Sequence, residues 1–272
     1  MNELVTKNWT GERLETHIFT ENTIEHLHRY GVAIQLALGK VVLDIASGEG
    51  YGSNLLSRVA IKVTGVDISA DTIERAKKKY QNANLSFVVG AADRIPLADK
   101  SVDLVVSFET IEHHDKHDEM LIEIKRVLKE QGTVIISSPN KLNYSDRANY
   151  KNPFHVKELY ENEFKALINK NFKNATFLHQ QTFYGSILLT EEKSVNFEEY
   201  IGNYNGITRK AEFTSYYIVV VASDFSLPEL GSSIFKDSFV IGSLINDVKK
   251  SRSYRLGYFL LKPLRFIKRL FN

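Results

Sequence analysis

Apolar runs and amphipathic segments alternate along the chain from residue 40 onward. Five short apolar runs predict buried strands, at Lys40–Ile45, Ile61–Asp67, Leu85–Gly90, Val102–Phe108 and Gly132–Ser138. Three segments between them have the apolar spacing of helices, at Asn54–Ala60, Ala70–Tyr80 and Asp118–Glu130. Strands that alternate with helices pair in parallel, so the pattern predicts an α/β fold with a doubly wound sheet.

The rest of the chain divides around this core. Glu161–Asn171 predicts a helix, and Ala175–Phe183 and Ser215–Ala222 predict strands. About thirty residues separate those two strands, which is too many for a hairpin loop, so we expect an insertion at about 184–214 near the substrate. We expect a helical cap at 1–39 that includes a helix at Ile24–Leu38, a main domain at 40–225, a linker at 226–250 and a tail at 251–272.

A loop of small residues follows the first predicted strand, which ends in Asp44. Four of these residues leave room for a ligand close to the backbone: Ala46, Ser47, Gly48 and Gly50. In open α/β sheets, ligands bind at the carboxyl ends of strands. The frame Gly48-x-Gly50-x-x-Ser53 lacks the third glycine of a dinucleotide site, and Asp44 would repel a pyrophosphate. A sulfonium nucleoside that carries an ammonium group would instead be attracted to this carboxylate.

A second acid, Asp67, ends the second predicted strand, 23 residues after Asp44. A carboxylate in this place can accept hydrogen bonds from both hydroxyls of a ribose. Together with the small-residue loop, the two acids predict a nucleoside site at the edge of the sheet.

The motifs VVLDIASGEGYGS, GVDIS, VVGAADRIPLADKSVD and LVVSFETIEHH resemble the successive motifs of class I S-adenosylmethionine-dependent methyltransferases. The resemblance covers residues 40–140 motif by motif and residues 140–223 more loosely. It implies a Rossmann-like, seven-stranded, mostly parallel sheet with helices on both faces. It also implies an enzyme that uses S-adenosylmethionine as its methyl donor.

Site residues follow from this resemblance position by position. The methionine moiety would be lined by Asp44, Ala46, Ser47, Gly48 and Gly50; the ribose and adenine by Asp67, Ile68, Ala92 and Asp93; and the methyl end by Phe108 and Glu109. The family usually has glycine where Ala46 stands, so the alanine is tolerable if its backbone dihedrals are ordinary. The family often has an acid where Ala91 stands, so the adenine contact would pass to Asp93.

Further segments are similar to small methyltransferases encoded among bacterial surface-polysaccharide and glycosyltransferase genes: GERLETH, EHLHRY, SSPNKLNYSD, NPFHVKEL and YYIVVVASDFSLPE. This resemblance implies O-methylation of a sugar or polysaccharide-linked acceptor in cell-envelope glycan biosynthesis. Three alternatives stay open. They are N-methylation of an amino sugar, O-methylation of a quinone-like small molecule, and a non-catalytic cofactor-binding module in a glycan-assembly complex.

Transfer of a methyl group to a hydroxyl requires a base. His113, after the fourth predicted strand, is the first candidate, because imidazole titrates near neutrality. Glu112 precedes it, and His155 in Asn152-Pro153-Phe154-His155 is the second candidate, since it follows the fifth strand. The alternative for both histidines is a structural role, as a helix cap or a partner of backbone carbonyls.

The run Glu109-x-x-Glu112-His113 also resembles a divalent-metal motif of ubiquinone-pathway and small-RNA methyltransferases, with His155 as a distal ligand. Carboxylates and imidazoles suit Mg²⁺ or Mn²⁺. Many relatives with the same Glu-His pair lack a metal, so we assign no metal ligand here.

Composition narrows the class of protein. The chain has no cysteine, which excludes disulfides, thiolate zinc sites and cysteine catalysis. Its first residues are polar and of mixed charge, and no apolar run reaches the length of a membrane span, so we expect a cytoplasmic protein. Outside residues 249–272 there are 27 basic and 33 acidic side chains, which argues against nucleic-acid binding by the main domain.

Residues 249–272 hold eight basic side chains and no acidic one. Within them, apolar residues fall on one helical stripe: Leu256, Leu260, Leu264, Ile267 and Phe271. Pro263 would kink this helix. A basic amphipathic helix of this kind docks on an anionic membrane surface or on a partner protein, so we expect a peripheral location at the inner face of the membrane as one use of the tail.

Overall fold

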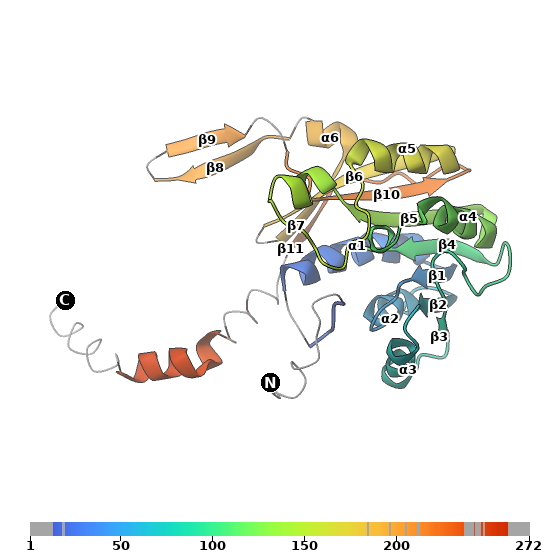
Figure 1. The fold of residues 1–272 in the computed structure, drawn as a ribbon, viewed down its shortest axis with the longest axis horizontal. Coiled ribbons are helices and arrows are strands. Elements are labelled where there is room, and N and C mark those ends of the chain that lie inside the picture. Colours follow the sequence, from blue (N-terminus) through green and yellow to red (C-terminus); the bar gives the residue numbers. More distant parts are fainter. Residues whose placement is uncertain are drawn as a thin grey trace.

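The carboxyl ends of five parallel strands carry the ligand-binding side of the sheet (Figure 1). The computed structural model describes residues 13–17, 20–183, 185–195, 197–204, 206–210, 213–236, 242, 246 and 248–260. The five strands are β1 (Val41–Ile45), β2 (Lys62–Asp67), β3 (Leu85–Val89), β4 (Val102–Ser107) and β5 (Leu128–Pro139). Their spatial order is β3-β2-β1-β4-β5, so the connections diverge on either side of β1 and β4 and leave a crevice there.

Four more strands extend the sheet beyond β5. They are β10 (Tyr217–Ser223), β6 (Asn174–Thr182), β7 (Gly185–Thr190) and β11 (Ser233–Lys236), and every pairing among them, and of β10 with β5, is antiparallel. Seven of the nine strands therefore point in one direction and two, β10 and β7, in the other. The predicted α/β class and mostly parallel sheet are confirmed, but the sheet has nine strands instead of seven.

The two additional strands come from segments that we expected to lie outside the sheet. Residues 185–190 belong to the predicted insertion, yet a tight turn after β6 folds them back as β7. Residues 233–236 belong to the predicted linker, yet they pair with β7 as the edge strand β11. Only the later part of the insertion leaves the sheet, as α6 (Glu191–Val195) and a separate hairpin of β8 (Glu199–Asn203) and β9 (Gly206–Lys210).

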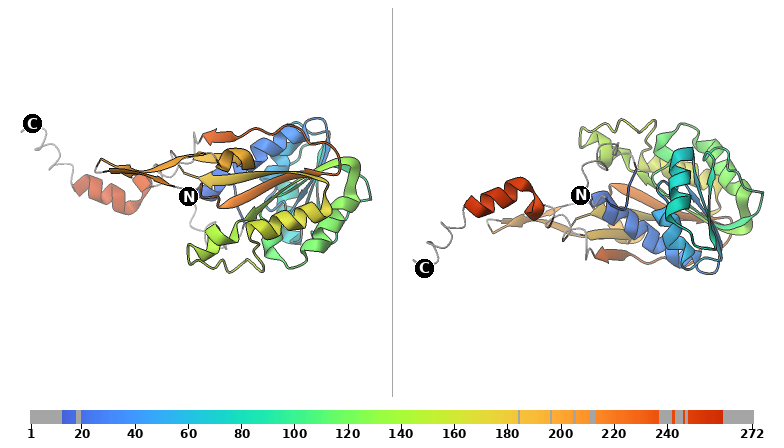
Figure 2. Two further views of the ribbon diagram at one scale, coloured as in Figure 1. Left: turned by 90° about the horizontal axis from the view of Figure 1, so that it is seen from above. Right: turned by 90° about the horizontal axis from the view of Figure 1, so that it is seen from below.

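Helices cover both faces of the sheet (Figures 1 and 2). On one face lie α1 (Glu21–Ala37) and α2 (Tyr51–Ser57), with α3 (Ala70–Lys79) beside β2 and β3. On the other face lie α4 (His117–Val127) and α5 (Glu161–Asn171). The Ser69 hydroxyl accepts from the Thr72 amide and so caps the start of α3. Because both faces are covered, the central strands are continuous apolar runs.

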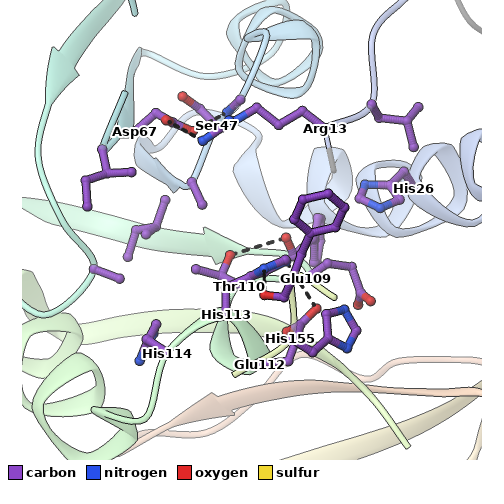
Figure 3. Close-up of a pocket in the computed structure, with 18 of the residues that line it drawn as sticks. Arg13, His26, Ser47, Asp67, Glu109, Thr110, Glu112, His113, His114 and His155 are labelled. Atoms are coloured by element: carbon purple, nitrogen blue, oxygen red, sulfur yellow. Dashed lines mark hydrogen bonds and ion pairs between the residues drawn. The ribbon is translucent and has the colours of Figure 1, made fainter. Parts of the chain in front are cut away.

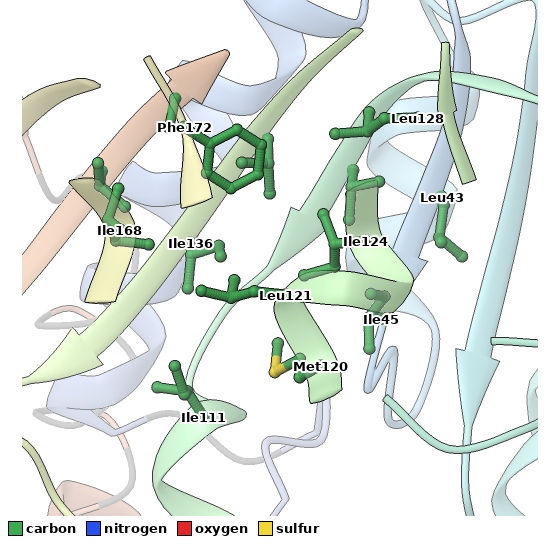
Figure 4. Close-up of a cluster of buried hydrophobic side chains, with 14 of the residues drawn as sticks. Leu43, Ile45, Ile111, Met120, Leu121, Ile124, Leu128, Ile136, Ile168 and Phe172 are labelled. Carbon is green, nitrogen blue, oxygen red and sulfur yellow. The ribbon is translucent and has the colours of Figure 1, made fainter. Parts of the chain in front are cut away.

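Two buried clusters fix the position of these helices. In the first, Leu121 and Ile124 of α4 and Ile168 of α5 pack on Ile45 and Ile136 of the sheet (Figure 4). The second cluster joins α1 and α2 to the opposite face, through residues that include Tyr30, Ala33, Leu56, Val106 and Phe108. The second cluster therefore holds α1 against the strand ends where a ligand would bind.

A helix at residues 252–260 projects away from the body of the molecule (Figures 1 and 2). It contains the first part of the predicted amphipathic tail, whereas Leu264, Ile267 and Phe271 lie outside the described residues. Within the described part of the chain, no helix has both the length and the hydropathy that crossing a membrane requires.

Candidate active site

A cavity of about 780 Å³ opens at the carboxyl ends of β1, β2 and β4 (Figure 3). The loops after these strands form its floor, α1 closes one side, and residues from the segment 144–155 close another. Arg13 and Leu14, from the short segment before α1, also line it. The cavity lies at the reversal of strand order, where ligands of open α/β sheets bind.

The loop after β1 turns sharply beneath the cavity. The Ser47 amide donates to the Val66 carbonyl at 2.9 Å, and the Gly50 amide donates to the Ser47 carbonyl at 2.9 Å. Gly48 and Gly50 have φ of 53° and 91°, and a Cβ on Gly50 would lie 2.7 Å from the Phe87 ring. Ala46 has φ of 55°, so the ordinary backbone dihedrals under which we expected this alanine to be tolerable are not present. Alanine is strained in this left-handed backbone conformation, whereas glycine adopts it without strain.

Asp44 lies behind this loop and not on the cavity surface. Its side chain is buried, and its carboxylate accepts from the Ser53 hydroxyl at 2.6 Å and from the Tyr30 hydroxyl at 3.2 Å. Burial raises the pKa of Asp44 to about 7, although these two hydrogen bonds oppose the shift. Asp44 therefore anchors α1 and α2 to β1, and it would act on a cationic ligand through its field and not by contact.

Asp67 lines the cavity and organises the neighbouring loops. Its carboxylate accepts from the Gly48 amide at 3.0 Å and from the Ser69 amide at 2.9 Å. The Arg13 guanidinium reaches the same carboxylate at 3.5 Å (Figure 3). Two backbone donors thus fix the orientation of the Asp67 carboxylate at the cavity wall.

The predicted adenine side has an apolar and a charged part. Ile68 is exposed over 71% of its surface and lines the cavity together with Ala92. Asp93 lines it too, but its carboxylate pairs with the Lys116 ammonium at 2.5 Å, which lowers the pKa of Asp93. Ile68 offers an apolar surface to a flat ring, and Asp93 lies at the edge of that surface.

At the opposite end, Phe108 and Glu109 follow β4. The Phe108 ring packs edge-on against Tyr30, with 5.0 Å between the ring centroids. Glu109 has φ of 50°, and its carboxylate accepts from the Ser137 hydroxyl at 2.6 Å and pairs with Arg29 at 3.0 Å. Both residues line the cavity where the resemblance placed the methyl group.

Arg29 is the main feature of this region that the sequence did not reveal. It is fully buried, its Nε donates to Gln180 at 2.7 Å, and its guanidinium lies 4.4 Å from the centre of the Tyr217 ring. Glu25 on α1 lies one turn away, and burial raises the pKa of that carboxyl. Helical spacing indicates only that Arg29 lies on the same face as Glu25, so no local signal separates it from a surface arginine.

The three catalytic candidates come together. Glu112, His113 and His155 each bring a ligand-type atom within 4.8 Å of the others, and all three line the cavity (Figure 3). The His113 Nδ1 donates to the Phe154 carbonyl at 3.0 Å, which leaves the lone pair on Nε2, 4.0 Å from the Glu112 carboxyl. Glu112 is buried, and its carboxyl oxygens have no hydrogen-bond partner among the described residues. Burial together with the Glu109 charge raises the pKa of Glu112 well above its usual value.

His155 is oriented from two sides. Its Nδ1 lies 2.6 Å from the Glu158 carboxylate, and its Nε2 accepts from the Asn152 amide nitrogen at 3.0 Å. The Asn152 carbonyl in turn accepts from the Phe154 amide, which fixes the direction of the side-chain amide. The three residues have the chemistry and spacing for a divalent cation, but the His155 lone pair is already used. Glu109 is held by Arg29 and Ser137, so it does not join this set.

Several lining residues were not predicted. They are Arg13, Glu25, His26, Tyr144 and Tyr217. Burial lowers the pKa of His26 to about 3, and this imidazole contacts the Tyr51 hydroxyl at 3.0 Å. These residues come from α1, from the segment before it, from the turn at 142–146 after β5 and from β10, so none belongs to the cofactor loop. Only the three-dimensional fold brings them to the cavity.

Comparison with known proteins identifies the core of this chain. Residues 43–136 match the model of the methyltransferase domain family. This stretch is similar to methyltransferase domains. S-adenosylmethionine is the cofactor of methyltransferases of this kind, so the predicted donor is confirmed at the level of the family. The match contains β1, the loop after it, and the candidate residues from Asp44 to His113.

Relatives in sequence are methyltransferases. A probable S-adenosylmethionine-dependent methyltransferase of Mycolicibacterium smegmatis is 34% identical over 162 residues, which cover 58% of this chain and 62% of that protein. A fatty-acid O-methyltransferase of the same organism is 31% identical over 117 residues, which cover 40% of this chain and 43% of that protein. The chain thus spans about three fifths of the length of the first relative and less of the second.

Solved structures agree on the fold. A methyltransferase from Archaeoglobus fulgidus has a TM-score of 0.55 at 20% identity, and the similarity covers 75% of this chain and 94% of that one. The YcgJ protein from Bacillus subtilis has a TM-score of 0.54 at 17% identity, over 78% of this chain and all of that one. At these identities, the similarity confirms the methyltransferase fold and not a shared acceptor.

Proposed function

We propose that this protein transfers the methyl group of S-adenosylmethionine to a hydroxyl of a sugar or polysaccharide-linked acceptor in cell-envelope glycan biosynthesis. The main support is the chemistry of the methyl end of the cavity. Among the described lining residues there, Glu25, Glu109 and Glu112 supply carboxyl groups, whereas the lining cations Arg13 and Lys116 pair with acids on the cofactor side. No described lining lysine or arginine lies at the methyl end, so a carboxylate or phosphate at the reacting end of an acceptor would lack a cationic partner there.

A polyhydroxyl acceptor fits these groups better. Glu112 is buried, and no side chain or backbone group in the described part of the chain hydrogen-bonds its carboxyl oxygens, so an acceptor hydroxyl placed beside it would satisfy a costly buried oxygen. Tyr144, Phe154 and Tyr217 line the same end and offer aromatic surface to the apolar faces of a sugar ring.

The mechanism needs alignment and a base, because the sulfonium methyl group is already activated. S-adenosylmethionine supplies that methyl group when it is bound. Asp67 holds the ribose, Ile68 the adenine, and the loop at 46–50 the methionine moiety. His113 presents Nε2 to the acceptor because the Phe154 carbonyl fixes its Nδ1 proton. His113 takes the acceptor proton as the oxygen attacks, and the Glu112 carboxyl, 4.0 Å from Nε2, is placed to hydrogen-bond the acceptor hydroxyl.

The decisive experiment transfers labelled methyl groups from S-adenosylmethionine to a panel of nucleotide sugars, glycans, amino sugars, phenols and fatty acids. We expect label on a hydroxyl of a sugar-containing acceptor. His113→Ala should lower kcat by about 100-fold or more while cofactor affinity, measured by calorimetry, stays near that of the wild type. Equal turnover of the two proteins would remove His113 as the base, and cofactor binding without transfer to any acceptor would favour the non-catalytic module.

An amino-sugar nitrogen is the second candidate, and the same observation favours it. The carboxyl groups at the methyl end would hydrogen-bond a neutral amine as well as a hydroxyl. Tandem mass spectrometry of the product, whose fragments place the methyl group on the nitrogen or on an oxygen, separates the two.

A further inference from the structure

The hairpin β8–β9 stands apart from the nine-stranded sheet and projects from the body of the molecule (Figures 1 and 2). Residues 200–208, YIGNYNGIT, contain no charged side chain. Tyr204 at its tip is fully exposed, and Ile201 and Ile207 are exposed over 50% and 75% of their surfaces. A two-stranded ribbon is only marginally stable in water by itself, so this exposed apolar tip indicates a surface that another structure covers.

Charge is confined to the base of this hairpin. Arg209 pairs with Glu198 at 2.7 Å, and Lys210 pairs with Glu199 at 3.1 Å. The charges at the base thus neutralise each other, whereas the tip offers a tyrosine, two isoleucines and polar backbone. Tyrosine with apolar neighbours is the combination that partitions into the boundary between lipid headgroups and acyl chains.

The helix at 252–260 extends from the same end of the molecule as the hairpin (Figures 1 and 2). Leu256, Phe259 and Leu260 are exposed over 61%, 72% and 63% of their surfaces. The residues around them are basic, since 249–272 contains eight lysines and arginines and no acid. This end of the molecule therefore combines apolar side chains with unneutralised positive charge.

We propose that the hairpin tip and the basic segment from Lys249 onward dock this protein together on an anionic lipid surface. Such a surface accepts both features at once, because its headgroups attract the basic residues and its acyl boundary takes up the apolar ones. A second copy of this chain fits less well, because a symmetric contact would bring two identical basic segments together. The remainder of the chain carries more acidic than basic residues, so the electrostatic attraction comes from this segment.

Vesicle sedimentation tests this proposal with the full chain and without any acceptor, so its result is independent of the proposed methyl transfer. Binding is compared on vesicles of phosphatidylcholine alone and of phosphatidylcholine mixed with phosphatidylglycerol. The hairpin variant is Tyr204→Ser with Ile207→Ser. The charge variant replaces four basic residues with glutamine: Lys249, Lys250, Arg252 and Arg255. The matched control is Ile122→Ser, an isoleucine exposed over 61% of its surface on α4, away from this end of the molecule.

The wild type should bind the anionic vesicles in a salt-sensitive way, and each variant should weaken that binding about tenfold or more, while the control binds as the wild type does. Each variant is first shown to unfold at the wild-type temperature, so that lost binding is not lost folding. The proposal is overturned if the wild type binds vesicles with phosphatidylglycerol no better than vesicles without it, or if the hairpin variant binds as well as the wild type. A wild-type dimer in light scattering that the hairpin variant dissociates, without lipid binding, would assign the tip to a second copy instead.

Discussion

Asp44 and Glu112 both keep a carboxyl group out of water, but for different purposes. Asp44 has hydrogen-bond donors from Ser53 and Tyr30 and lies behind the cavity wall, so it serves the packing of α1 and α2. Glu112 faces the cavity and has no such donor among the residues that the structure describes. A buried acceptor without a partner costs stability, which is the usual condition of a group that a ligand will satisfy.

The raised pKa of Asp44 predicts how stability depends on pH. Its ordinary value is 3.8 and its folded value is about 7, so the folded protein binds a proton that the unfolded chain releases. The protonated Asp44 carboxyl contributes its full share of the unfolding free energy below about pH 4. This contribution is lost progressively as the pH rises from about 4 to about 7. Between pH 5 and 7, the wild type should lose about 1 kcal/mol of unfolding free energy per pH unit relative to Asp44→Asn. Urea titrations at pH 5, 6 and 7 without cofactor measure this, and parallel pH profiles would contradict it.

Removal of metal ions gives a second prediction at this scale. Because Asn152 already donates to the His155 Nε2, a cation at Glu112 and His113 would have to displace a fixed amide. Methyl transfer should therefore keep its full rate after exhaustive treatment with a chelator. A loss of activity that Mg²⁺ or Mn²⁺ restores would show instead that Asn152 moves aside and that the three residues bind a metal.

At the scale of elements, the contact between α1 and α2 determines the shape of the cavity. Gly52 in α2 lies directly against the ring of Tyr30 in α1, and a Cβ there would approach the ring carbon Cζ to 1.9 Å. The Tyr30 ring also contacts Phe108, and its hydroxyl contacts Asp44. The close contact between α1 and α2 thus connects α1, β1 and the methyl end of the cavity.

Two glycine substitutions test this contact. Gly52→Ala should lower the unfolding free energy by about 2 to 3 kcal/mol, because the added methyl group separates the two helices. Gly31→Ala is the matched control, because Gly31 lies within α1 and an added Cβ would meet nothing within 4 Å. The control should gain about 0.5 to 1 kcal/mol from improved helix propensity. Chemical denaturation of both variants measures these values, and equal stability of the two would disprove the contact.

At the scale of the whole molecule, the chain has an edge strand that stabilises the sheet and a terminal segment that leaves it. β11 pairs with β7, and its Ser233 hydroxyl contacts the His28 Nε2 on α1 at 3.0 Å. The helix at 252–260 follows this strand but projects into solvent (Figure 1). Truncation after β11 should therefore leave the stability of the fold nearly unchanged, whereas truncation before β11 should lower it.

A chain that ends at residue 250 should unfold within about 2 °C of the full chain and should bind S-adenosylmethionine with the same affinity. A chain that ends at residue 230 lacks β11 and should unfold about 5 °C lower, because the edge of β7 and the His28 contact are exposed. Differential scanning calorimetry and titration calorimetry measure both. A large drop in the unfolding temperature of the chain that ends at residue 250 would show that the terminal helix packs on the body.

The sequence by itself determined the parallel half of the sheet and the cofactor loop. Apolar runs of strand length and helices with caps are local patterns. Ala46, Gly48 and Gly50 directly follow β1 and Asp67 ends β2, so their placement needs no knowledge of distant contacts. Glu112 and His113 are adjacent in the chain, and their meeting with His155 followed from the order of the strands.

Only the tertiary structure decided the rest. Whether 185–190 and 233–236 join the sheet depends on an available edge, and that edge exists only after β6 has paired with β10. The left-handed conformation of Ala46, the retreat of Asp44 behind the loop and the burial of Arg29 among Glu25, Glu109 and Tyr217 are likewise set by neighbours far away in the chain. Local patterns specify which element a residue belongs to, whereas the charge state and reach of a side chain depend on what the whole fold packs around it.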